Sequence, residues 1–214
     1  QVQAGRPAAT RLPHGDFEIG SDPPAAGVPV ASLPGWGART GSLEADRVGV
    51  SAGLVPAAKL ADKEREPAKL PDRKGLWAPG RALPLPDEAF RPRPELGKAV
   101  LKLEVRPAPR TDAKGQPFAY QMPLERTFLA VDGPPVRLPP GTLVRVSGWV
   151  KVAGGIAGTA DGALLYDDAG GEPLGVRVLT TGNEWQRYQL YRHVPASGQI
   201  ALTAALTGAG VAYF

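Results

Sequence analysis

The sequence predicts an all-β fold, a sandwich of about nine antiparallel strands in two sheets. The first observation is alternation, which is clearest across residues 142–152. Four valines share one parity there, at Val144, Val146, Val150 and Val152. Successive side chains of a strand point to opposite faces, so one face is apolar and the other polar. The second observation is composition: 27 glycines and 24 prolines among 214 residues suit a turn-rich fold and oppose a helical bundle.

The first quarter of the chain contains few regular segments. Residues 1–13 are predicted to be a lead-in. Residues 15–19 are predicted to form a first strand, and residues 43–51 a second. Trp36 stands between two glycines after a loop, and this setting is more typical of a packing anchor than of a ligand site.

A proline-rich segment then interrupts the strands at residues 56–97. Its frequent prolines forbid long regular structure. Large apolar residues in it, among them Trp77 and Phe90, favour an ordered insertion that wraps the sandwich, and a disordered linker is the alternative. Apart from this insertion, residues 1–214 are predicted to form a single β-sandwich domain.

The remaining strands follow in sequence, separated by turn signals such as residues 168–173 and 195–198. They are predicted at residues 99–106, 124–131, 142–152, 163–167, 175–179, 185–194, 199–207 and 211–214. Tyr188 and Leu190 are expected to face the core. Tyr213 and Phe214 are expected to cap one end of the sandwich.

The charge pattern argues against some classes of partner. The formal net charge is +4, and the basic residues are dispersed rather than gathered in a run that would follow phosphates, so no nucleic-acid partner is predicted. No apolar stretch reaches 18 residues, so no membrane span is predicted. The absence of cysteine rules out disulfides and thiolate metal sites. The chain begins at Gln1 without a methionine, which favours a mature secreted or cell-surface protein.

Several short segments, taken in order, resemble a known group of proteins. They are Gly-Asp-Phe-Glu at residues 15–18, Gly35-Trp36, residues 97–103, 144–151, 185–188 and 211–214. In this order they resemble the jelly-roll carbohydrate-binding modules of the galactose-binding-domain-like group. The resemblance implies a jelly-roll sandwich that is commonly non-catalytic and is often attached to secreted enzymes or surface proteins.

The same resemblance implies a structural calcium ion between the first and last strands. The matching position is Glu18, and Asp16 shares its parity, so both carboxylates would face one ion. The partner aspartate of that group would follow Phe214, beyond the given sequence. The alternative is that Glu18 and Asp16 are ordinary acidic residues of an exposed strand.

Candidate ligand-binding residues lie on two strands. An aromatic ring matches the apolar C–H face of a pyranose, and polar neighbours bond its hydroxyls. The residues of this kind that share the polar parity are Trp149, Arg145, Arg187, Gln189 and Tyr191. They would form one groove if the two strands lie in one sheet with these faces aligned. The alternative is that this parity packs under the insertion, and Trp185 is expected to be a packing residue.

No catalytic motif is present, so no enzyme is predicted. His14 and His193 belong to no nucleophile or metal pattern. The acidic residues between positions 161 and 172 are interpreted as turn residues rather than as a glycosidase pair. Two functions stay open: a carbohydrate-binding-like module whose partner is a polysaccharide or glycan, and a structural or assembly module that binds a protein through the sandwich face or the insertion.

Overall fold

The computed structural model describes residues 28–41, 48–57, 99–107, 110–118, 127–182 and 184–214, and nearly all regular structure in these ranges is β-strand. The described strands are accompanied by the 3₁₀ turns η1 (Val30–Ser32) and η5 (Glu172–Leu174). All pairings between the named strands are antiparallel.

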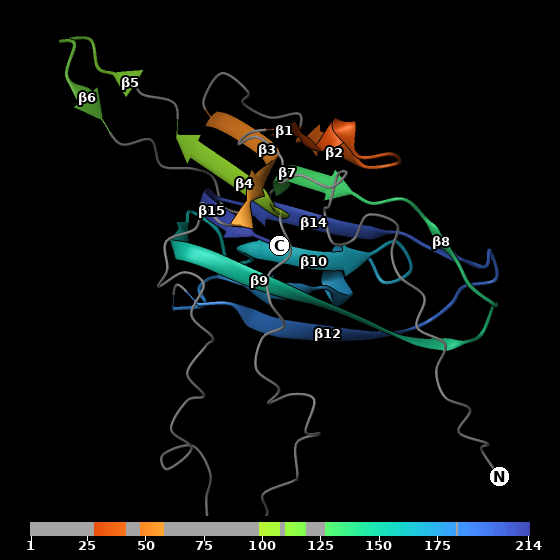
Figure 1. Cartoon of the computed structure of the whole chain (residues 1–214). Coiled ribbons are helices and arrows are strands. Elements are labelled where there is room, and N and C mark those ends of the chain that lie inside the picture. The colour runs from red at the N-terminus through yellow and green to blue at the C-terminus, as the bar shows by residue number, and fades with distance from the viewer. Residues whose placement is uncertain (1–27, 42–47, 58–98, 108–109, 119–126, 183) are drawn as a thin grey trace, which may run out of the picture.

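Two large sheets make up the body of the molecule (Figure 1). The six-stranded sheet has the order β1 (Val28–Pro29), β3 (Val48–Pro56), β4 (Ala99–Pro107), β15 (Ala209–Tyr213), β9 (Leu143–Ala157) and β12 (Gln186–His193). The five-stranded sheet has the order β11 (Val176–Val178), β10 (Ala163–Asp167), β14 (Leu202–Thr207), β7 (Thr127–Asp132) and β2 (Gly37–Thr40). Two small ribbons complete the described strands, β13 (Gln199–Ile200) with β8 (Val136–Arg137), and β5 (Arg110–Thr111) with β6 (Pro117–Phe118).

The path of the chain between the sheets is that of a jelly roll. After β4 in the six-stranded sheet, the large strands β7, β9, β10, β12, β14 and β15 alternate between the two sheets. Such crossing connections let each strand turn its apolar parity toward the opposite sheet. The predicted all-β sandwich is therefore confirmed.

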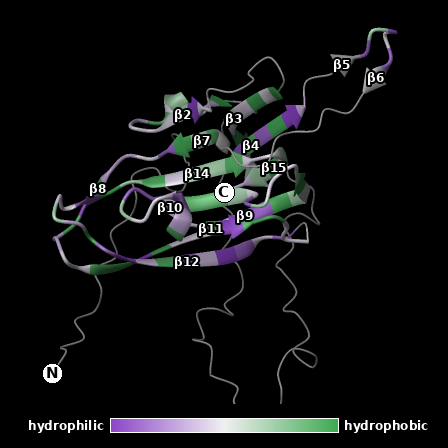
Figure 2. Cartoon of the chain, turned by 180° about the vertical axis from the view of Figure 1, so that it is seen from behind, coloured by the Kyte–Doolittle hydropathy of each residue, from purple (hydrophilic) through white to green (hydrophobic). Residues whose placement is uncertain are grey.

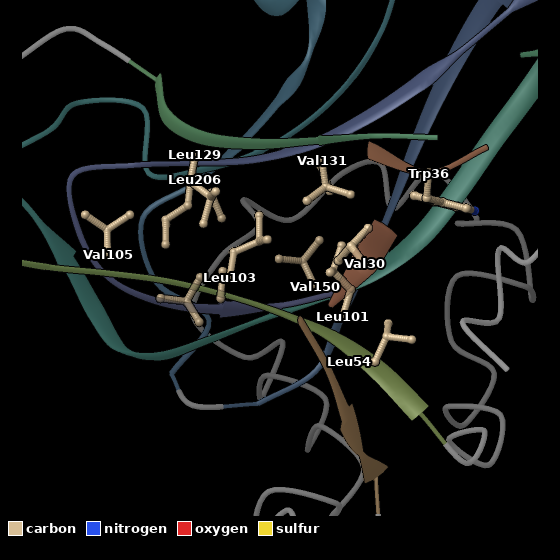
Figure 3. Packing of buried hydrophobic residues seen from close by; sticks show 14 of the residues in the cluster. Val30, Trp36, Leu54, Leu101, Leu103, Val105, Leu129, Val131, Val150 and Leu206 are labelled. Atoms are coloured by element: carbon tan, nitrogen blue, oxygen red, sulfur yellow. The ribbon is translucent and has the colours of Figure 1, made fainter. Parts of the chain in front are cut away.

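One apolar core lies between the sheets (Figure 3). Leu101, Leu103 and Val105 of β4 face it, as do Leu129 and Val131 of β7, and all five are almost fully buried. The alternation expected for the valine-rich strand also holds, because Val150 and Val152 of β9 are buried in the same core. Period-two patterning thus places the strands against one another through their apolar faces.

Trp36 is the packing anchor that the sequence predicts. It is 7% exposed and belongs to the core cluster. Gly133 makes room for it, because a β-carbon at that position would lie 3.1 Å from Cη2 of the indole. Adding a methyl group there would force the ring or the backbone to shift.

Near β12 and β10 a buried ion pair joins the two sheets. Nε of Arg192, on β12, lies 2.7 Å from Oδ2 of Asp167, on β10, and Asp167 is fully buried. Oδ1 of Asp167 accepts a 2.8 Å hydrogen bond from the N–H of Gly170 in the following turn. Arg192 also donates to the carbonyl oxygen of Leu174, so one side chain ties β12 to the whole turn after β10.

The predicted strand positions mostly agree with the structure, with differences at the ends. Strand β3 continues to Pro56, beyond the expected end at residue 51. Strand β9 continues from 152 to Ala157 because Gly154 and Gly155 adopt positive φ angles in an irregularity opposite β15. The predicted lead-in (1–13) and first strand (15–19) lie outside the described residues, as does the insertion (56–97) apart from Pro56 and Ala57.

Candidate functional site

Strands β9 and β12 lie side by side at one edge of the six-stranded sheet, and their register sets the geometry of the candidate site (Figure 1). Arg187 pairs with Trp149, Gln189 with Ser147, and Tyr191 with Arg145. Directly opposite residues project on the same face, with β-carbons about 5 Å apart. All five predicted ligand-binding residues therefore lie on one continuous face, which we call the β9–β12 face.

The β9–β12 face points away from the core. Val150 and Val152, of the other parity of β9, are buried between the sheets. On β12, Tyr188 packs against the same core and Leu190 is 7% exposed, as the sequence predicts. Burial raises the pKa of the Tyr188 phenol above its ordinary value. Figure 2 shows the contrast along the sandwich: β12 is largely hydrophilic, whereas β10 and β14 are mostly hydrophobic.

The half of this face that includes Tyr191 is open. Tyr191 is 57% exposed, and its hydroxyl donates to Oε1 of Gln189 over 3.4 Å. Arg145 and Ser147 on the neighbouring strand are exposed as well. Leu143, which pairs with His193, is 59% exposed. Aromatic, polar and apolar groups thus reach solvent together at this end.

The other half of the face is an apolar cluster, which also includes residues of β4 and β15. Val100, Trp185 and Ala57 are buried in it, and Trp149 and Tyr213 pack against it while keeping some exposure. The ring centroids of Trp185 and Tyr213 lie 6.4 Å apart at an interplanar angle of 53°. Trp185 is therefore the packing residue that was expected. Trp149 is partly buried: one part of its side chain packs against this cluster, as the packing interpretation requires, and another part stays accessible to a ligand.

Lys151 is buried, although the alternation of its strand predicts that it belongs to the polar, outward face. Its parity places it with Arg145 and Ser147, yet it is fully buried. It pairs with Tyr213 on β15, within the aromatic end of the face. A period-two pattern cannot distinguish the open end of a strand from a covered end, and no signal in the local sequence marks this burial.

The described histidine, His193, and the acidic residues between positions 161 and 172 lie near turns and strand ends. Nδ1 of His193 lies 3.3 Å from the carbonyl oxygen of Gly141 at the end of the β9–β12 face, and His14 lies outside the described residues. Asp161 accepts from Arg177 over 2.6 Å, and Asp168 accepts the N–H of Ala201 over 2.9 Å. These acids hold turns and strand ends in place.

The predicted calcium ligands cannot be placed. Glu18 and Asp16 lie outside the described residues, so the calcium hypothesis stays a prediction. Within the described ranges, no group of three or more His, Asp or Glu side chains is arranged to hold a metal ion. In those ranges, too, no helix has the length and apolar character that a membrane crossing requires.

Comparison with known proteins gives only distant likeness. No protein-family model matches the chain, and no curated protein sequence does. Among solved structures, TmCBM61 in complex with β-1,4-galactotriose is 17% identical with a TM-score of 0.41, covering 84% of this chain and 82% of its own. The enzymatically active domain of bacteriophage CBA120 tailspike protein 4 is 13% identical with a TM-score of 0.37, covering 90% of this chain and 20% of its own. Both TM-scores are too low for either likeness to indicate function.

Proposed function

We propose that this chain is a non-catalytic carbohydrate-binding module of a secreted or cell-surface protein, and that it binds a glycan on the β9–β12 face. The observation that carries the proposal is the register, which gathers Trp149, Arg187, Gln189, Tyr191 and Arg145 on one outward face. Each aromatic residue in this set has a cation directly opposite it.

Tyr191 is the better stacking platform of the two aromatics. Its ring is 57% exposed, whereas Trp149 packs partly against the apolar cluster of Val100 and Trp185. A pyranose can lay its C–H face on an exposed ring because this contact removes apolar surface of both partners from water. Trp149 would then form a wall at the far end of the ligand.

Polar groups between the two aromatics would bond the sugar hydroxyls. Gln189 and Ser147 form the row between the Trp149 row and the Tyr191 row. An amide offers two donors and an acceptor, and a serine hydroxyl offers both functions, so this row complements vicinal hydroxyl groups. These contacts would select the stereochemistry of the sugar that the aromatics hold.

A glycan-array screen of the full chain beside the Tyr191→Ala variant tests this proposal. We expect selective binding that falls by about tenfold or more in the variant, because removing the apolar surface of a large side chain from water contributes about 1.5–3 kcal/mol. The matched control is Leu174→Ala, because Leu174 is 62% exposed and lies in η5, away from the β9–β12 face.

The control variant should bind as the natural chain does, and both variants should unfold at nearly the same denaturant concentration. Absence of binding to every glycan on the array would contradict the proposal. Equal loss of binding in both variants would also contradict it, because the effect would then not belong to this face.

A second function, docking of a protein partner, has one specific observation in its favour. Leu143 is 59% exposed and is a diagonal neighbour of Tyr191 across the strands. Tyrosine is enriched at protein interfaces, and the adjacent leucine would enlarge the apolar surface that a partner could cover. A Leu143→Ser variant that keeps glycan binding would favour the carbohydrate proposal over this one.

A further inference from the structure

We propose that the glycan bound on the β9–β12 face contains an N-acetylamino sugar, whose acetamido group lies between His193 and Leu143. This inference rests on the proposed function, since it names the chemical class of the ligand for that same site. It is argued from three exposed side chains of the open half, those of Tyr191, His193 and Leu143, and from the hydrogen bond that fixes the imidazole.

The register brings these three side chains together. His193 pairs directly with Leu143, and Tyr191 precedes His193 by two residues on the same face of β12. The β-carbons of opposite residues lie about 5 Å apart, those of neighbours along one face about 7 Å, and diagonal neighbours about 7–8 Å. Tyr191 and Leu143 are 57% and 59% exposed, and His193 is exposed as well. A phenol, an imidazole and an isobutyl group thus reach solvent within the span of one substituted sugar.

The imidazole of His193 is held in one tautomer, with an acceptor nitrogen left for a ligand. Nδ1 lies 3.3 Å from the carbonyl oxygen of Gly141, and a carbonyl oxygen only accepts hydrogen bonds, so Nδ1 carries the proton. In the neutral ring Nε2 is then the acceptor nitrogen. No hydrogen bond from another described residue occupies Nε2. This ring can therefore accept a hydrogen bond from an N–H group of a ligand.

The backbone that fixes this tautomer is itself held by the end of the β9–β12 ladder. The N–H of Gly141 donates to the carbonyl oxygen of Val194 over 2.8 Å, and the N–H of Val194 donates to that of Thr142 over 2.9 Å. Gly141 has a φ of 75°, a conformation that favours glycine. The carbonyl group that accepts from Nδ1 is thus fixed, so the acceptor nitrogen is positioned before a ligand arrives.

The direction of the Tyr191 ring leaves the His193–Leu143 row open. The Tyr191 hydroxyl donates to Oε1 of Gln189 over 3.4 Å, and Gln189 and His193 lie on opposite sides of Tyr191 along β12. The ring therefore leans toward Gln189 and away from His193. A sugar that stacks on Tyr191 would extend a substituent over the His193–Leu143 row.

An acetamido group fits this row better than a hydroxyl group does. Its N–H can donate to Nε2 of His193, and its methyl group can remove apolar surface of Leu143 from water. A hydroxyl group could use the imidazole but would leave the leucine in contact with water. Each of the two contacts is expected to raise the affinity about three- to fivefold, and both together about tenfold or more.

The test compares N-acetylamino sugars with the sugars that carry a hydroxyl group in place of the acetamido group. Polyacrylamide carriers bearing N-acetylglucosamine, glucose, N-acetylgalactosamine or galactose at equal density are titrated onto the immobilised full chain by biolayer interferometry. Each pair differs only in the acetamido group, and the two pairs differ from each other in ring stereochemistry. We expect at least one acetamido carrier to bind about tenfold or more tightly than its hydroxyl partner.

Variants assign the preference to the His193–Leu143 row. His193→Phe keeps a flat ring without an acceptor, and Leu143→Ser removes the apolar contact. Each should keep binding to the hydroxyl carrier and lower the ratio of the two affinities about three- to fivefold. Leu174→Ser is the matched control and should keep the natural ratio, because Leu174 is 62% exposed in η5, away from this face. An unchanged ratio in both test variants, or an equal fall in the control, would overturn the inference.

The remaining outcomes separate this inference from the function on which it rests. Equal binding within both pairs, abolished by Tyr191→Ala, would overturn the acetamido ligand and keep the carbohydrate-binding site. A glycan array whose bound members all lack an N-acetylamino sugar would do the same. No binding of any of the four carriers, together with a blank glycan array, would overturn both.

Discussion

The outer faces of the two sheets make an instructive comparison. Over β10, β14 and β7 of the five-stranded sheet, the outward residues Leu164, Ala205 and Ala130 are at most 1% exposed. Over β9 and β12 of the six-stranded sheet, the outward Tyr191 is 57% exposed. Both faces point away from the core, yet the first is closed at these positions, whereas the half of the β9–β12 face that includes Tyr191 is open.

A side-chain bridge across the five-stranded sheet accounts for part of its closure. Nη2 of Arg39, on β2, donates to the hydroxyl of Tyr166, on β10, over 2.8 Å. Because β7 and β14 lie between these strands, the two side chains meet above them. Ala130 and Ala205 share a row with Arg39, and their small side chains leave room for this bridge. Burial raises the pKa of the Tyr166 phenol, in keeping with a covered face.

Among the described strands, β12 is the last of its sheet and has β9 beside it. A central strand has neighbours on both sides whose long side chains can fold over it, whereas an edge strand has them on one side only. Position within the sheet therefore helps to decide whether an outward side chain is available to a ligand. Three predictions test this difference, from the largest expected effect to the smallest.

The largest loss of folding stability is expected from replacing an inward-facing side chain of β12. Arg192→Leu should destabilise the protein by about 3–5 kcal/mol, because it leaves the buried carboxylate of Asp167 without its cation. The measurement is urea unfolding monitored by tryptophan fluorescence. Tyr191→Leu, on the outward side of the same strand, should cost less than about 1 kcal/mol, because Tyr191 is 57% exposed. Similar costs for the two variants would mean that β12 does not have one structural and one accessible side.

An intermediate loss of stability is expected from placing a larger side chain at a buried position on the outer face of the five-stranded sheet. Ala205→Leu should cost about 1–3 kcal/mol, because Ala205 is fully buried beneath neighbours that must shift. Gln189→Leu places the same side chain on the open face and should change stability by about 0.5 kcal/mol or less. Equal midpoints in urea for the two variants would show that the outer face of the five-stranded sheet is not closed.

The smallest effect concerns a polar residue on a central strand of the six-stranded sheet. Burial raises the pKa of Glu104, but hydrogen bonds from Lys102 and Arg106 lower it more, so its pKa in the folded protein is below the ordinary value of 4.5. Its stabilising contribution is therefore present above that ordinary pKa and is lost as the pH falls through the folded pKa. The contribution should be about 1 kcal/mol or less, because Arg106 is 76% exposed and its pairing is screened.

The check is the unfolding midpoint measured from pH 6 to pH 3 for the natural chain and for Glu104→Gln. The variant should lose less stability over this acid range, because it no longer has the ionised form that the lysine and arginine favour. A variant curve parallel to that of the natural chain would contradict the pairing.

Much of the fold was predictable because strand patterning is local. The alternation of Leu101, Leu103 and Val105 with charged residues predicts β4, and the valine parity predicts the core side of β9. The parities of Trp149 and of Arg187, Gln189 and Tyr191 also predicted which residues could share a face. Whether they did share one depended on β9 and β12 being neighbours in register, and this pairing joins segments far apart in the sequence.

The sequence by itself determined the fold class, the apolar side of each main strand and the packing roles of Trp36 and Trp185, since these follow from residue size, parity and turn residues within short segments. Only the tertiary structure decided that Lys151 is buried while Tyr191 is exposed, although both have the outward parity of their strands. The physical reason is that side-chain direction is set by the local backbone, whereas exposure depends on which distant strands and side chains come to lie alongside.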